Sequence, residues 1–244
     1  MTLHEKGKIY LSEPVGKYIP ELMNMTVAKN SRDPVTEIDT VEIIAAEQKI
    51  KIHDLLRHTA GFTYGFFGNS PARQKLKESG IGNLNAMELS LKDFVSQLAN
   101  LPLAYQPGKH WEYGRSVEVL GHLIEVVSDK KLDSFMTTNI FEPLNLVDTG
   151  FWVTKEDWSR IAEPLPNSGE PKLINVTQQP KLLSGGHGLV STVGDYLRFC
   201  QMMLNGGVLD GTRVLSSKTV QYITANHLGT VSYTHLTLPT SDLV

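Results

Sequence analysis

The chain has 244 residues, of which 41% are hydrophobic and 20% charged, and its formal net charge is −3 at pH 7. This composition is that of an ordinary globular protein, and the absence of a basic block argues against a nucleic-acid partner. No apolar run approaches the roughly 20 residues that a spanning helix needs, so no membrane segment is predicted in this chain. The expected partners are small molecules.

The histidines and the single cysteine predict no metal site. His53 and His58 are separated by five residues, which places them on different faces of a helix, and one cysteine cannot form a thiolate cluster. Cys200 occupies an apolar position of a predicted helix, where we expect a buried and unreactive thiol. No cofactor is predicted.

The first residues, MTLHEK, predict the end of a helix that Gly7 stops. An extended stretch follows, and then two strand-like runs, MTVAK at 25–29 and TVEII at 40–44, separated by the turn-rich NSRDP. A short helix is predicted at HDLLRH. The remaining predicted elements are mainly helices, at 71–79, 91–100, 116–127, 132–141, 192–205 and 216–225.

The helix at 192–205 has the clearest periodicity. Thr192 and Asp195 resemble a capping box at its start, and the pair Gly206-Gly207 ends it. Its apolar residues recur at helical spacing and predict a stripe that faces the core. The stripe consists of Val193, Tyr196, Leu197, Cys200, Met203 and Leu204.

The chain after this helix contains a hairpin signal and an unusual tail. Asp210-Gly211 lies between two short apolar pairs in VLDGTRVL, which is typical of a tight β-hairpin. Residues 230–244 change character abruptly, and VSYTHLTLPT resembles translated sequencing adaptor. We expect this tail to be foreign to the domain; the alternative is a β-strand, because Val, Tyr and Thr favour one.

Five stretches, in order from about residue 1 to 229, resemble the serine β-lactamase and penicillin-binding-protein superfamily, in particular its class C-like esterase branch. They are KGKIYLSEPVGKYIPEL, IKIHDLLRHTAGFTYGF, YQPGKHWEYGRSVEVLGHLIEVVS, IFEPLNLVDTGF and SGGHGLVSTVGDYLRFCQMMLNGGVLDGTRVLSSKTVQYITANH. The resemblance implies an α+β fold of the β-lactamase/transpeptidase type. Residues 1–229 would form a partial domain, mainly its helical region, without most of the antiparallel sheet.

The resemblance also implies a serine nucleophile in S-x-x-K, its lysine and a tyrosine that moves the proton. A free tyrosine has a pKa near 10 and is a poor base at neutral pH, but an adjacent ammonium lowers that pKa. Tyr113 in WEYGRSVEVLG matches the family tyrosine and is the expected general base. Arg115 stands where many members carry Asn; it is expected either to bind substrate or to be a solvated surface residue. His187 is a further candidate for substrate binding.

The other catalytic parts are missing from the sequence. The one S-x-x-K match, Ser128 to Lys131, follows an apolar helix, where the helix-end carbonyls would oppose an oxyanion, and we interpret it as a surface segment. By the resemblance, the catalytic serine lies about ten residues before Met1. Lys218-Thr219-Val220 lacks the glycine of a K-T-G strand. We therefore expect no hydrolase activity from this chain.

The expected parent protein is a serine hydrolase that acts on carboxylic esters or related amides through an acyl-enzyme. One alternative is a class C β-lactamase or D-Ala-D-Ala carboxypeptidase. Another is a non-catalytic homologue that binds a peptide or a protein partner. The sequence leaves the compartment open.

Overall fold

The computed structural model describes residues 1–32, 39–66, 68–82, 88–165, 169 and 173–228. These residues form helices and two small antiparallel sheets, so the α+β prediction is confirmed. The α-helices are α1 Thr2–Glu5, α2 Ile52–Leu56, α3 Pro71–Glu78, α4 Leu91–Ala99, α5 Ser116–Ser128, α6 Leu132–Met136, α7 Glu142–Leu144, α8 Val193–Leu204 and α9 Ser217–Ile223. Shorter 3-10 or π turns are η1 Val15–Lys17, η2 Pro20–Leu22, η3 Thr137–Phe141 and η4 Lys155–Arg160.

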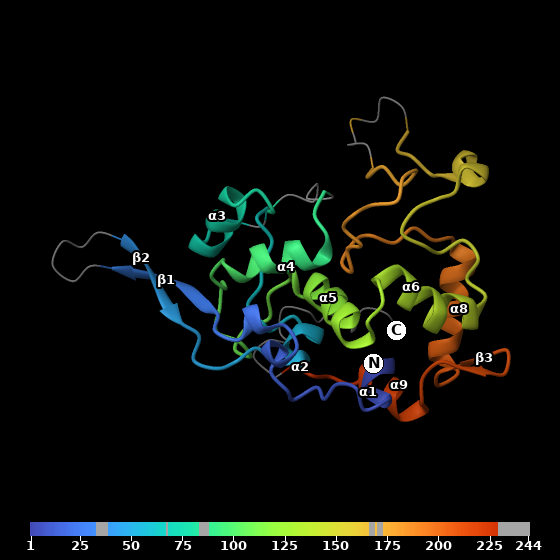
Figure 1. Ribbon diagram of the computed structural model, residues 1–244, viewed down its shortest axis with the longest axis horizontal. Coiled ribbons are helices and arrows are strands. Elements are labelled where there is room, and N and C mark those ends of the chain that lie inside the picture. Colours follow the sequence, from blue (N-terminus) through green and yellow to red (C-terminus); the bar gives the residue numbers. More distant parts are fainter. Residues whose placement is uncertain (33–38, 67, 83–87, 166–168, 170–172, 229–244) are drawn as a thin grey trace, which may run out of the picture.

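Helix α5 lies at the centre of the molecule (Figure 1), and α1, α2, α4 and α6 pack against it. It is the most apolar of the predicted helices, and its inward residues Val119 and Leu123 are almost fully buried. Leu91 and Leu132 fill the space beside Gly121, where an added Cβ would lie 3.1 Å from Leu132 Cδ2 and that side chain would have to shift. The helix ends at Asp129, which adopts the left-handed conformation.

The strands β1 Thr26–Arg32 and β2 Asp39–Ala45 form an antiparallel hairpin that projects from one side of the molecule (Figure 1). Both strand predictions are confirmed, but β1 continues through Asn30, Ser31 and Arg32, which were expected to belong to a turn. The hairpin contacts the helical body where Val27 pairs with Leu103.

The predicted helix 132–141 is present with a change of winding. Helix α6 passes into the π-helical η3 and then directly into α7, which ends at Asn145 in the left-handed conformation. The wider π turn lets Phe141 and Leu144 point into a second, smaller core with Leu146, Met202 and Leu209.

Helix α8 packs through the face opposite to the one expected. Val193 is 88%, Leu197 64% and Leu204 81% exposed, and Tyr196 and Cys200 are also exposed. The predicted core stripe and the predicted buried thiol are therefore wrong, and of that stripe only Met203 joins the small core as a partly buried residue.

The second face of α8 explains this orientation. Met202 is buried against α7, and Arg198 Nε donates to the Leu144 carbonyl oxygen over 2.7 Å. Thr192 caps the helix by accepting from the Asp195 backbone N–H. The Asp195 carboxylate points away from the cap and accepts hydrogen bonds from the Asp148 N–H and the Thr149 hydroxyl, each 2.8 Å long.

The predicted hairpin after α8 is confirmed as β3 Val208–Leu209 and β4 Thr212–Arg213. Asp210 and Gly211 both have positive φ, as a two-residue turn of this kind requires. Helix α9 then lies against α1, where the Ser216 N–H donates to Glu5. The expected foreign tail, 230–244, lies outside the described residues.

Among the residues that the structure describes, we find no helix with the length and apolar character needed to cross a bilayer.

Candidate active site

Tyr113 lies on the loop that enters α5, and its side chain is 43% exposed. Its ring contacts the rings of His58 and Tyr64, each with centroids 5.2 Å apart, and stacks on Trp111 at 6.4 Å. These aromatic neighbours hold the phenol at the surface of the helical body without burying it. A group that takes a proton from a second molecule needs this kind of access.

Backbone hydrogen bonds fix this loop against the segment His58-Thr59-Ala60-Gly61. The Gly108 N–H donates to the Thr59 carbonyl and the Glu112 N–H donates to the His58 carbonyl. Gly114 passes so close to the next residue of that segment that an added Cβ would collide with the Phe62 carbonyl oxygen. This close approach explains why position 114 is a glycine.

Arg115 is in the interior, with 1% of its surface exposed, so the solvated-surface alternative is wrong. Its guanidinium lies over the rings of Tyr64, at 4.7 Å, and Phe94, at 5.3 Å. It also pairs with Glu118 one helical turn later, at 3.2 Å. A role of Arg115 in substrate binding stays a prediction, and the contacts favour an indirect role through Tyr64 and Glu118.

Glu118 joins α5 to the glycine-rich segment that precedes α8. The Ser184 hydroxyl lies 3.1 Å from Glu118 Oε1 and 2.9 Å from His187 Nδ1, while His187 Nδ1 lies 3.6 Å from the same carboxylate oxygen. A Cβ on Gly186 would lie 2.8 Å from Glu118 Oε1, so the backbone must approach closely there. The structure thus places His187 and Arg115 in one interaction network, which is joined through Glu118.

The ionisation of this group follows from its surroundings. Burial alone raises the pKa of Glu118, but the interaction with His187 and the charge of Arg115 outweigh it, so the net pKa is lowered and the carboxylate stays ionised. Burial, and then the Glu118 charge, raise the pKa of Tyr64. Burial lowers the pKa of His58 against the opposing effect of Glu118. Tyr64 and His58 are therefore neutral neighbours of Tyr113 near pH 7.

The sequence signals judged to be non-catalytic have structural roles. Ser128 is the last residue of α5, and its hydroxyl donates to the Ile124 carbonyl oxygen. Lys218-Thr219-Val220 lies within α9, as expected.

Sequence reasoning missed Glu118 and Ser184. The spacing of Arg115 and Glu118 was a usable signal, because residues three apart on a helix are neighbours. Ser184 carried no such signal, since its partner is 66 residues away. No group of three or more potential metal ligands is found among the described residues. A pocket of about 860 Å³ lies elsewhere, and Tyr113 is not one of its lining residues.

The model of the beta-lactamase family matches residues 1–237, and the chain belongs to that family. Protein Rv1367c of Mycobacterium tuberculosis is 30% identical over 234 residues, which cover 93% of this chain and 56% of that protein. Lovastatin esterase of Penicillium rubens is 27% identical over 236 residues, covering 92% of this chain and 55% of the esterase.

Comparison with solved structures gives the same fold. The structure of EstCE1, described as a hydrolase with promiscuous acyltransferase activity, superimposes with a TM-score of 0.71 at 22% identity, covering 96% of this chain and 61% of EstCE1. The chain thus has the β-lactamase-like fold. It spans 55 to 56% of the length of the two sequence relatives above.

Proposed function

We propose that the parent protein is a serine hydrolase of carboxylic esters in which Tyr113 is the general base. The observation that carries this proposal is the position of Tyr113, which is exposed at the entry of the central helix and in contact with the rings of His58, Tyr64 and Trp111. Membership of the beta-lactamase family and the similarity to a lovastatin esterase support the ester substrate.

The proposed reaction has two stages. The serine oxygen bonds to the ester carbonyl carbon while the Tyr113 phenolate takes the hydroxyl proton; an adjacent lysine ammonium keeps the phenol ionised. The tetrahedral intermediate then expels the alkoxide, which takes the proton from Tyr113 and leaves as an alcohol. Water repeats the sequence at the acyl-enzyme and releases the acid.

We also propose that the 244-residue chain alone does not catalyse this reaction. The reaction needs a serine and a lysine in S-x-x-K, and the one match, Ser128 to Lys131, is at the far end of α5 from Tyr113. The Ser128 hydroxyl is already bonded to a backbone carbonyl oxygen, 2.6 Å away. Without a serine, Tyr113 has no hydroxyl proton to accept, and without a nearby ammonium its phenol is not ionised at neutral pH.

Two measurements test the chain. Incubation with a fluorophosphonate should label no serine, and hydrolysis of a chromogenic acetate ester should not exceed the rate in buffer. The matched control is Tyr113→Phe, which should give the same trace as the unchanged chain. Covalent labelling of any serine would refute the proposed inactivity.

The parent's activity is tested with the reading frame extended by its flanking genomic sequence. That product should hydrolyse acetate or butyrate esters, become labelled at the serine of an S-x-x-K segment, and lose at least about a hundredfold of kcat with Tyr113→Phe. An extended protein without S-x-x-K and without labelling would favour the non-catalytic, partner-binding alternative.

A further inference from the structure

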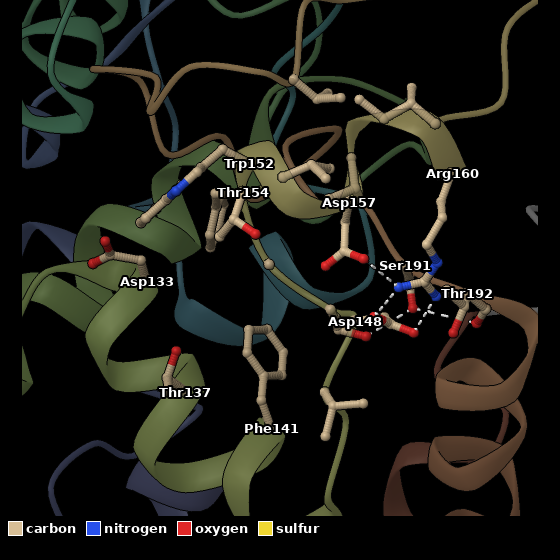
Figure 2. Close-up of a pocket in the computed structure, with 18 of the residues that line it drawn as sticks. Asp133, Thr137, Phe141, Asp148, Trp152, Thr154, Asp157, Arg160, Ser191 and Thr192 are labelled. Carbon is tan, nitrogen blue, oxygen red and sulfur yellow. Dashed lines mark hydrogen bonds and ion pairs between the residues drawn. The ribbon is translucent and has the colours of Figure 1, made fainter.

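A pocket of about 860 Å³ lies apart from the tyrosine site, between α6 with η3 and the segments that surround η4 (Figure 2). Its size falls in the range of about 300–1,000 Å³ that is usual for small-molecule sites. Apolar side chains make up much of its surface. They are Phe141, Val147, Phe151, Trp152, Val153, Ile161, Ala162, Leu173, Ile174, Val176 and Val190.

The floor of the pocket is rigidly supported. Phe141 and Phe151 also belong to the two hydrophobic cores and are 5% and 3% exposed. Gly150 and Val190 exchange two backbone hydrogen bonds beneath the pocket, 3.1 and 2.8 Å long. Figure 2 shows Phe141 directed toward the cavity, with Trp152 and Asp133 on one side of it and Asp148 with Arg160 on the other. The aromatic floor is therefore held in place by the two hydrophobic cores and by this pair of backbone hydrogen bonds.

The rim of the pocket is anionic. Among the described residues, four carboxylates line it, Asp133, Asp148, Asp157 and Glu163, together with the guanidinium of Arg160. That guanidinium is occupied, because it donates two hydrogen bonds to Asp148, at 2.7 and 2.6 Å, and one to Asp157, at 2.9 Å. The described lining residues thus carry a formal charge of −3, and the Arg160 guanidinium among them is already paired with Asp148 and Asp157.

We propose that this pocket binds small amphipathic cations, with an aryl or alkyl group on the aromatic floor and an ammonium group at the carboxylate rim. Apolar burial supplies affinity without regard to charge, whereas the rim favours positive over negative ligands. Trp152 adds a ring face that attracts an ammonium. An anion of the same shape meets the same floor but an unfavourable rim. The proposal concerns this chain alone and does not depend on the proposed hydrolase function.

Isothermal titration calorimetry with two probes that share a phenylbutyl arm tests the charge preference. Phenylbutyltrimethylammonium should bind at least about tenfold more tightly than phenylpentanoate in low salt, and the ratio should shrink in molar salt because the rim is solvated. Equal binding of both probes, or binding of neither, would overturn the proposal.

Variants that remove rim carboxylates test whether the rim causes the preference for the cationic probe. Asp157→Asn together with Asp133→Asn should weaken the cation severalfold and leave the anion unchanged or tighter. Glu156→Gln is the matched control, because Glu156 precedes Asp157 on η4 but does not line the pocket. An equal effect of the control would show that general charge, and not this rim, is responsible.

A steric variant locates the binding itself. Thr137 is exposed on η3 and lines the pocket, so Thr137→Trp should fill the mouth and abolish binding of the cation. The control is Glu142→Trp, at an exposed position outside the lining, which should bind normally. Circular dichroism verifies that each variant is folded. Unchanged binding to a folded Thr137→Trp variant would place the cation elsewhere and refute the proposal.

Discussion

Arg115 Nη1 lies 3.2 Å from Glu118 Oε1 inside the protein, and the two side chains are 1% and 0% exposed. The pair connects the entry of the central helix, where Tyr113 lies, to the glycine-rich segment that carries Ser184 and His187. A buried pair of this kind adds little net stability compared with apolar residues, but removing one partner leaves an uncompensated charge in the interior.

Replacing Glu118 by Gln should therefore destabilise the chain strongly. The expected loss is about 3–5 kcal/mol of the free energy of unfolding, measured by urea denaturation, because Arg115 stays charged in the core. Lys181→Gln is the control, since Lys181 pairs with Glu88 at the surface and the midpoint should not move. A loss below 1 kcal/mol for Glu118→Gln would contradict the buried pair.

Two glycine-to-alanine substitutions should change the free energy of unfolding in opposite directions. Gly114→Ala should cost about 1–3 kcal/mol, because its Cβ collides with the backbone carbonyl of Phe62. Gly194→Ala should stabilise by up to about 1 kcal/mol, because the position is in the first turn of α8 and an added Cβ would lie 3.9 Å from Thr192 Oγ1, in ordinary van der Waals contact. Thermal unfolding of both variants checks the prediction, and stabilisation by Gly114→Ala would contradict the close approach.

The unexpected orientation of α8 is tested by a pair of truncations. Met202→Ala should cost about 2–5 kcal/mol, since Met202 is 1% exposed, whereas Leu197→Ala at 64% exposure should cost less than about 1 kcal/mol. Denaturant unfolding gives both values. If Leu197 is the more sensitive position, the helix packs through the face that its periodicity indicated.

The same orientation exposes the single thiol. Cys200 should react with a thiol-specific disulfide reagent in the native chain nearly as fast as in denaturant. The absorbance of the released thiolate measures the rate, and Cys200→Ser sets the background. Protection by a factor of a hundred or more in the native state would mean that the thiol is covered.

His58 should make the chain less stable in mild acid. Burial lowers the pKa of its imidazole below the ordinary 6.5, so the unfolded chain binds a proton first as the pH falls. The stability that neutral His58 contributes is fully present above pH 6.5, and it is lost as the pH falls from 6.5 through the lowered pKa of the folded state. The unfolding midpoint at pH 7 and pH 5 measures the loss, and His58→Asn, which tolerates the positive φ of 56° at this position, should reduce it. An NMR titration giving a pKa above 6.5 would contradict the prediction.

The local elements were predictable because their signals are local. Caps, glycine stops and turn residues fix where helices and hairpins begin and end, as at Thr192 and at Asp210-Gly211, whatever surrounds them. Family resemblance added Tyr113, since a motif in its order along the chain needs no coordinates. The sequence thus determined the helices, both hairpins and the candidate base.

Only the tertiary structure decided which surfaces meet. Helix α8 has apolar side chains on two faces, and periodicity cannot choose between them. Its orientation is set by the hydrogen bonds of Asp195 to the Asp148 N–H and of Arg198 to the Leu144 carbonyl, whose partners are about fifty residues apart in the chain. The sequence left open whether Arg115 binds substrate or lies solvated at the surface. Its interior position depends on its neighbour Glu118 and on Tyr64 and Phe94, which come from two other segments of the chain. The sum of such distant contacts, and not any local propensity, determines burial.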